Sequence, residues 1–331
     1  MLNRTLTSNF ARLIFLLILG VSCHGTNTTE PVAISNVGPG SILFLAYHHQ
    51  AKHPSQSVSK KRLYSMNVDG TNIRPLTDTS ITVTFASYSP DGKRIVLAMG
   101  HPSYRYEVVE SLKVMDCDGG HPRLLTNTPA RFAVWSPDSR QIAFNVEQSF
   151  PGGYSIFGFN AIGADGTGER RLTKDYGVYH LSGWPKGSCL LGYVTKDTLD
   201  GTKTVDGNYI FLMDTLGKIQ QRWGGGGESS WAPLASEDGR YIVYISTKSG
   251  TRSAYLLDVD RNRDSLILQD QREVFKEPRA FSPDGLQLLY NAGYSDYNKM
   301  RILDLRTGAV KDIAPFKDDT TTCLAVSWGR N

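Results

Sequence analysis

Short runs of alternating apolar and polar residues, separated by tight polar turns, recur along most of the chain. In residues 133–144 an apolar run ends at Trp135, the turn 136–139 (Ser-Pro-Asp-Ser) follows, and a second alternating run begins. Proline presets φ at the second position of a β-turn, and the last position takes a left-handed conformation that suits glycine. Because Val, Ile, Tyr and Phe are frequent in the flanking runs, each such stretch predicts a β-hairpin.

A third apolar run with an acidic turn and a short fourth run follow each hairpin. In one unit these are 112–119 (Leu-Lys-Val-Met-Asp-Cys-Asp-Gly) and 123–126 (Arg-Leu-Leu-Thr). The order predicts four antiparallel strands per unit. We expect the Asp side chains to bond to the backbone of their own turns, because an isolated Asp-x-Asp-Gly lacks the distal Glu of a calcium loop.

The unit returns at a nearly constant spacing. The residues that precede the six turns are separated by 47, 49, 51, 46 and 47 positions. These residues are Tyr88, Trp135, Trp184, Ala235, Phe281 and Trp328. Four-stranded units repeated every 40–50 residues or so are typical of a β-propeller, in which neighbouring blades bury each other's faces. We therefore interpret the three tryptophans of this set as packing between blades.

The two ends of the repeat region complement each other. The run 41–45 (Ser-Ile-Leu-Phe-Leu) matches the second strand of a unit and has no innermost strand before it. The run 323–328 matches an innermost strand and has no second strand after it. We predict that the last strand completes the first blade. The predicted fold class is therefore all-β, a closed six-bladed β-propeller formed by residues 41–331.

The repeats resemble those of TolB-type, WD-like β-propellers of the bacterial envelope. The resemblance rests on aromatic-Ser-Pro-Asp-Gly turns, on Met-Asp-x-Asp-Gly at 115–119 and on Arg-Leu-Leu-Thr at 123–126, with Ser139 in place of the expected glycine. It implies the propeller fold, and together with an export signal and the lack of catalytic motifs it favours a non-catalytic binding module. TolB itself has an α/β domain before its propeller, and we expect this chain to lack that domain.

Residues 1–22 read as a signal peptide, with Arg4 and Arg12 followed by the short apolar run 13–19. Gly-Val-Ser and then Cys23 resemble a lipobox, so we expect lipidation of Cys23 and a flexible tether over 23–40. His24 stands where an inner-membrane retention signal has Asp, which favours an outer-membrane lipoprotein facing the periplasm or the cell surface. The alternative is cleavage without lipidation, which gives a soluble periplasmic or secreted protein.

Composition narrows the function further. The formal net charge is +4, from 36 Lys and Arg against 32 Asp and Glu, which argues against a nucleic-acid partner. The chain has no Gly-x-Ser-x-Gly, His-Glu-x-x-His, Walker or Cys-x-x-Cys motif. We therefore expect no enzyme, no cofactor and no metal.

Cys117, Cys189 and Cys323 lie on predicted strands of three blades and are expected to be free thiols. We also expect a monomer that contacts the membrane through its lipid alone.

The partner, an envelope protein or a glycan, is expected to bind the rim of the propeller or the mouth of its channel. The predicted contacts combine histidines with the Tyr and Arg that are enriched at binding hot spots. They are His48, His49, His53, Tyr104, Arg105, Tyr106, His180, Arg279, Tyr294 and Tyr297.

The alternative function is a metal-dependent, polysaccharide-lyase-like propeller enzyme. It resembles lyases whose channel histidines hold a metal, and it requires histidines to converge. The candidates are His48, His49, His53, His101 and His180.

Overall fold

The computed structural model describes residues 40–48, 60–78, 80–102, 107–130, 132–149, 155–173, 179–185, 189–194, 208–224, 229–269, 275–293, 299–316 and 321–330. Every regular element in these ranges is a β-strand, as the alternating pattern predicted. In these ranges no helix is long and apolar enough to cross a membrane. Cys23 and the segment before residue 40 lie outside the described residues.

The strands follow one another along the chain with turns or longer connections between them. They are β1 (Ser41–His48), β2 (Arg62–Asn67), β3 (Arg74–Pro75), β4 (Thr82–Tyr88), β5 (Arg94–Pro102), β6 (Glu107–Asp116), β7 (Arg123–Thr126), β8 (Ala133–Trp135), β9 (Gln141–Ser149), β10 (Ser155–Gly163), β11 (Arg170–Arg171), β12 (Tyr179–Gly183), β13 (Cys189–Val194), β14 (Tyr209–Asp214), β15 (Ile219–Gly224), β16 (Ser230–Ala235), β17 (Tyr241–Ser246), β18 (Ser253–Asp258), β19 (Arg263–Gln269), β20 (Phe275–Phe281), β21 (Gln287–Gly293), β22 (Lys299–Asp304), β23 (Val310–Ile313) and β24 (Thr321–Gly329).

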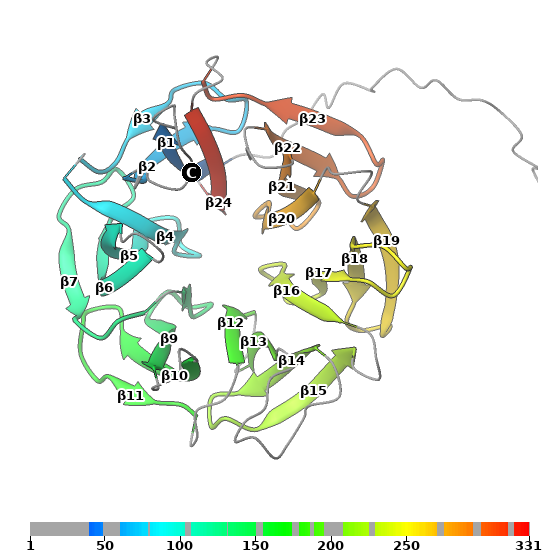
Figure 1. The fold of residues 1–331 in the computed structure, drawn as a ribbon, viewed down its shortest axis with the longest axis horizontal. Helices are drawn as coiled ribbons and strands as arrows, with labels where there is room; N and C mark the ends of the chain where they lie inside the picture. The colour runs from blue at the N-terminus through cyan, green and yellow to red at the C-terminus, as the bar shows by residue number, and fades with distance from the viewer. Residues whose placement is uncertain are drawn as a thin grey trace, which may run out of the picture. The chain divides into compact units, whose positions relative to one another are not determined.

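These strands form six four-stranded antiparallel sheets, which confirms the predicted six-bladed propeller. Blade one has the order β24-β1-β2-β3, and blades two to six take β4–β7, β8–β11, β12–β15, β16–β19 and β20–β23. The blades stand in a ring with the first strand of each order facing the centre (Figure 1). The outer strands β3 and β11 have two residues each, and such short edges limit pairing with other chains.

Blade one closes the ring as the ends of the repeat region predicted. Strand β24 pairs antiparallel with β1, with Ala325 opposite Phe44 and Cys323 opposite Ala46. In Figure 1 the red C-terminal strand lies beside the blue first strand. Each innermost strand is therefore hydrogen-bonded to a second strand of its own blade.

The hydrophobic core lies between blades. One cluster joins Leu112 and Val114 of blade two to Ile142 and Phe144 of blade three, and all four are buried. Burial of apolar area is the main favourable term in folding, at about 25 cal/mol per Å². Trp135, Trp184 and Trp328 pack in or against three such clusters, which confirms their predicted place between blades.

Cys117, Cys189 and Cys323 are free thiols, as expected. Cys189 begins β13 and Cys323 is buried in β24. Cys117 lies one residue beyond the end of β6, so its predicted place on a strand was wrong. The chain turns there because Asp116 and Gly119 form a backbone hydrogen bond that ends the strand.

Candidate functional site

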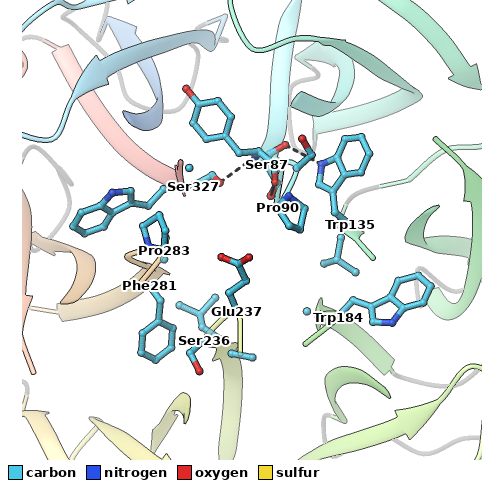
Figure 2. Close-up of a pocket in the computed structure, with 18 of the residues that line it drawn as sticks. Ser87, Pro90, Trp135, Trp184, Ser236, Glu237, Phe281, Pro283 and Ser327 are labelled. Carbon is cyan, nitrogen blue, oxygen red and sulfur yellow. Dashed lines mark hydrogen bonds between the residues drawn. The ribbon is translucent and has the colours of Figure 1, made fainter. Parts of the chain in front are cut away.

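The mouth of the central channel is a pocket of about 250 Å³ at the ends of the six innermost strands. Each blade contributes its turn or the residues just before it. Figure 2 shows this arrangement, with Ser87 and Pro90 of blade two, Trp135 of blade three, Trp184 of blade four, and side chains of blades five, six and one around a common centre. The repeated turn of the sequence therefore builds the site.

In blades two, three, five and six, a serine and an aspartate hold the repeated turn in one conformation. Ser136 donates its hydroxyl to Asp138 at 2.6 Å and accepts the backbone N–H of Gln141 at 2.8 Å. The bonds from the Ser136 hydroxyl and from the Arg140 N–H hold the pKa of the Asp138 carboxyl below its usual value. The same Ser–Asp bond recurs at 2.5–2.6 Å in blades two, five and six. The lining of the pocket is therefore preorganised.

Ser139, which stands where the repeat has glycine, links two blades at the mouth. Its φ is +59°, the left-handed conformation that glycine has at equivalent positions. The Ser139 hydroxyl accepts the backbone N–H of Asp91 at 3.1 Å. Its carbonyl accepts from the Arg94 guanidinium at 2.6 Å. The serine side chain thus adds one bond from blade two that a glycine could not accept, beside the bond to its backbone carbonyl.

Bulges place three further residues in the wall of the pocket. The register of an innermost strand skips Ser182 in β12, Arg279 in β20 and Val326 in β24. Each lies two positions before the residue that precedes the turn, and each lines the pocket. A bulged residue leaves the ladder and its side chain is re-aimed, here toward the channel.

Arg279 carries the charge of this set of bulged residues. Its guanidinium forms an ion pair with Glu277 at 2.5 Å, and both side chains are about three-quarters buried. The Nε atom of Arg279 is buried and donates to no described residue. The cation is thus held at the wall and is largely neutralised by its neighbour.

Glu237 is the acidic side chain of the pocket. It occupies the turn position that holds proline in blades two, three and six. Figure 2 shows its carboxylate near the centre of the pocket. Arg330, which follows β24 of blade one, forms an ion pair with it at 2.9 Å. This pair bridges blades one and five across the mouth.

No protein-family model matches the chain. The Tol-Pal system protein TolB of Francisella tularensis subsp. mediasiatica is 37% identical over 83 residues, which cover 24% of this chain and 19% of the relative. The match therefore spans about a fifth of the relative's length. The crystal structure of TolB from Acinetobacter baumannii superposes with a TM-score of 0.65 at 15% identity, covering 88% of this chain and 67% of that one.

The chain folds as a TolB-like β-propeller. The fold is shared more widely, since an oligogalacturonate lyase in complex with manganese superposes with a TM-score of 0.50 at 12% identity. That likeness covers 84% of this chain and 80% of the lyase.

The TolB-like propeller brings one predicted contact into the pocket. Arg279 lines it, whereas His180 stacks on Tyr193 within blade four, with ring centroids 4.5 Å apart. His48 ends β1, and its side chain is not described. Cys23 and the remaining predicted contacts lie outside the described residues. These remaining contacts are His49, His53, Tyr104, Arg105, Tyr106, Tyr294 and Tyr297.

Sequence reasoning missed Glu237, Arg330 and Ser182 in this TolB-like propeller. Glu237 had a signal, because it breaks the Ser-Pro-Asp-Gly repeat at one position of one blade. Within the described ranges, no three His, Cys, Asp or Glu side chains gather to hold a metal ion. The described part of the mouth has apolar walls, serine hydroxyls and two ion pairs.

Proposed function

We propose that this chain is a non-catalytic binding module of the bacterial envelope and that its channel mouth receives part of a protein partner. The observation that supports this most directly is the preorganised pocket, in which Glu237 lies among apolar turns and walls. Apolar concave sites with a few fixed polar groups are the usual form of a binding site. The relative's place in a Tol-Pal system supports a protein as the partner.

The rim contacts predicted from sequence form the second half of this proposal. His48 ends the second strand β1, and Tyr104 and Tyr294 follow the second strands β5 and β21 in the sequence. Each of these strands begins beside the channel mouth, so its far end lies on the opposite face. A partner or glycan held there would leave the mouth accessible. We therefore propose two binding faces rather than one, with the propeller acting as a monomer.

We further propose that the protein is exported and held at the outer membrane by lipid on Cys23. The basic start, the short apolar run and the small residues before Cys23 support this. Several acyl chains on one cysteine give stable anchoring, because each buried CH₂ contributes about 0.8 kcal/mol. Residues 23–40 then act as a tether for the ring. Without lipidation the protein would be soluble in the periplasm or secreted.

Charge reversal at the channel mouth tests the binding role. The variant Glu237→Lys changes the centre of the pocket, and Asp260→Lys is a matched control in the same blade. Asp260 lies in the neighbouring outer turn, which is joined to the first by the bond from the Val259 N–H to the Arg240 carbonyl at 3.0 Å. Envelope extract is cross-linked to each purified protein, and the captured partners are identified by mass spectrometry.

We expect one partner to be captured by the unaltered protein and by Asp260→Lys, and to be lost from Glu237→Lys. A peptide with the sequence of the captured partner completes the test if it binds the unaltered propeller and does not bind Glu237→Lys. Equal capture by all three proteins would refute the channel mouth as the site.

The polysaccharide lyase remains the alternative, and the likeness to the oligogalacturonate lyase supports it at the level of fold. Of its five candidate histidines, His180 has a described side chain, and that ring stacks on Tyr193. The test is incubation of the protein with oligogalacturonate and manganese. The enzyme would be favoured if the unaltered protein forms shorter products and a triple variant does not. That variant has alanine in place of His48, His49 and His53.

A further inference from the structure

A second pocket, of about 160 Å³, lies on blade one away from the channel mouth. It is lined by the end of β1, the start of β2, Thr321 at the start of β24 and Phe316 from the connection that precedes it. Since β24 reaches the channel mouth at its other end, this pocket belongs to the opposite face of the propeller. Its volume is below the 300 Å³ or so of the smallest common ligand sites, so it suits one terminal group of a larger ligand.

Aromatic side chains form a fixed wall of this pocket. The ring of Tyr64 stacks on Phe44, with centroids 5.4 Å apart, and meets Phe316 edge-on at 5.6 Å. Tyr47 lies on the same lining, with the Lys61 ammonium 5.6 Å from its ring centroid. Aromatic pairs of this geometry stabilise their own arrangement by about 1 kcal/mol. The pocket is therefore preformed and has apolar surface against which the apolar face of a ring can pack.

Arg62 is held so that part of its guanidinium is left for a ligand. Its Nε donates to the Thr77 carbonyl, and its central carbon lies 5.5 Å from the centroid of the Tyr64 ring. Thr77 is itself fixed, because its hydroxyl accepts the Leu63 N–H at 3.1 Å. The terminal nitrogens of Arg62 donate to no described residue. A guanidinium over a ring keeps its N–H bonds in its own plane, where they match a carboxylate.

The charge of the lining is positive. Lys60 and Arg62 both line the pocket, and among its described lining residues there is no carboxylate. The nearby Asp78 is engaged in its own turn, where its Oδ1 accepts the Ser80 N–H at 2.6 Å and the Ser80 hydroxyl. Lys60 makes one long bond to the Ser80 carbonyl at 3.4 Å. Two cations beside an aromatic wall favour an anion attached to a ring that has one apolar face.

We propose that this pocket binds the terminal acidic sugar of a glycan, with Arg62 and Lys60 on its carboxylate and the aromatic wall against the C–H face of its ring. The site is separate from the channel mouth and does not depend on a protein partner there. The envelope as the source of the glycan rests on the proposed export, whereas the chemistry of the pocket does not.

The test uses the purified propeller and three defined probes: methyl β-D-glucuronide, its uncharged counterpart methyl β-D-glucoside, and inorganic phosphate. Binding is followed by NMR titration of labelled protein. The variant Arg62→Gln removes the paired N–H donors and the charge of the guanidinium, and Arg222→Gln is its matched control. Arg222 also lies over a tyrosine, Tyr209, with its central carbon 5.9 Å from the ring centroid, but on the exposed strand β15 of blade four.

We expect saturable shifts with the glucuronide at residues around Tyr64 and much weaker ones with the glucoside. Arg62→Gln should weaken glucuronide binding about tenfold to a hundredfold, because a charge-assisted bidentate pair is lost. Arg222→Gln should leave binding unchanged. The thermal midpoint of each variant shows whether it is folded, and Lys60→Gln provides a second, exposed substitution that should weaken binding in the same direction.

Three outcomes would overturn the proposal. These are no saturable binding of the glucuronide, equal binding by Arg62→Gln and the unaltered protein, and phosphate binding as tight as that of the glucuronide. The last result would identify a simple anion site without a sugar. Because no partner protein is present in the test, failure here leaves the channel-mouth experiment unaffected.

Discussion

The side-chain carbonyl of Asn291 accepts the backbone N–H of Ala325 at 3.1 Å, which joins blade six to the innermost strand of blade one. The amide of the same Asn291 donates to the Cys323 carbonyl at 3.0 Å. Asn291 is completely buried. The closing strand is therefore attached to its own blade by the β24–β1 ladder and to the preceding blade by a side-chain clamp.

The variant Asn291→Ala should weaken ring closure. It leaves one N–H and one C=O of β24 buried without their partner, and each such group costs about 1–3 kcal/mol. We expect a loss of roughly 2–4 kcal/mol in the free energy of unfolding, measured by urea denaturation. The control is Asn160→Ala, which removes an exposed amide bonded to Glu169 at 2.9 Å and should change stability by about 0.5 kcal/mol or less. Equal losses in the two variants would show that the clamp does not stabilise the closure.

Two glycines at the same repeat position should differ in their tolerance of alanine. Gly92 and Gly285 have φ values of +72° and +71°. A Cβ on Gly92 would lie 2.8 Å from the Arg330 carbonyl, whereas on Gly285 it would meet the Ser236 Cβ at an ordinary 3.6 Å. Gly285→Ala should cost about 1–2 kcal/mol from the left-handed backbone alone.

The cost of Gly92→Ala should be larger than that of Gly285→Ala by about 1 kcal/mol or more, because a backbone oxygen cannot move aside as a flexible side chain can. Thermal unfolding of the two single variants measures the difference directly. Identical midpoints would mean that the backbone at Arg330 shifts without cost. That result would also weaken the case for the Arg330–Glu237 pair as a fixed part of the channel mouth.

The fold could be predicted from sequence because its information is local and repeated. Each Ser-x-Asp turn encodes its own hydrogen bonds, as in Ser282 to Asp284 at 2.5 Å, and the regular spacing of the turns implies the ring. Closure followed from the unmatched strands at the two ends. Asn145 of blade three acts as Asn291 does, since its side-chain oxygen accepts the Leu181 N–H of blade four at 3.2 Å. Both asparagines have a sequence signal, because each lies ten positions after the residue that precedes its turn.

The channel site was less accessible to sequence reasoning because it depends on contacts between distant residues. The Glu237–Arg330 pair joins positions 93 residues apart, and no local pattern encodes it. The bulge that places Arg279 on the wall arises from the register between β20 and β21. The sequence placed Arg279 among the contacts expected at the rim or the channel mouth, but its pairing with Glu277 depends on the folded strand.

Lipidation should depend on the thiol of Cys23 and on no other cysteine. The variant Cys23→Ser removes the acceptor, whereas Cys189→Ser alters a thiol inside the propeller and serves as the control. We expect metabolic labelling with a clickable fatty acid to mark the unaltered protein and Cys189→Ser, and to leave Cys23→Ser unmarked and soluble on fractionation. Labelling of all three proteins would refute Cys23 as the anchor, and labelling of none would favour simple cleavage.

Asp304 should make the stability of the propeller depend on pH in the acid range. The Arg306 guanidinium bonds to it at 2.8 Å, and this contact, with the N–H groups of Arg306 and Thr307, lowers the pKa of the carboxyl from 3.8 to about 2. Asp304 is almost completely buried, with a relative exposure of 4%. Because the pKa is lower in the folded state, its contribution is full above pH 4 or so and is lost as pH falls through about 2.

The variant Asp304→Asn keeps the acceptor for the two N–H groups and removes the charge. At neutral pH it should be less stable by at most about 2 kcal/mol, since one unit of pKa shift is about 1.4 kcal/mol. Urea denaturation of both proteins at pH 7, 4 and 2 should show this gap narrow between pH 4 and pH 2, while the exposed Asp260→Asn shows none. A gap that stays constant down to pH 2 would assign the effect to turn geometry rather than to the ionised carboxylate.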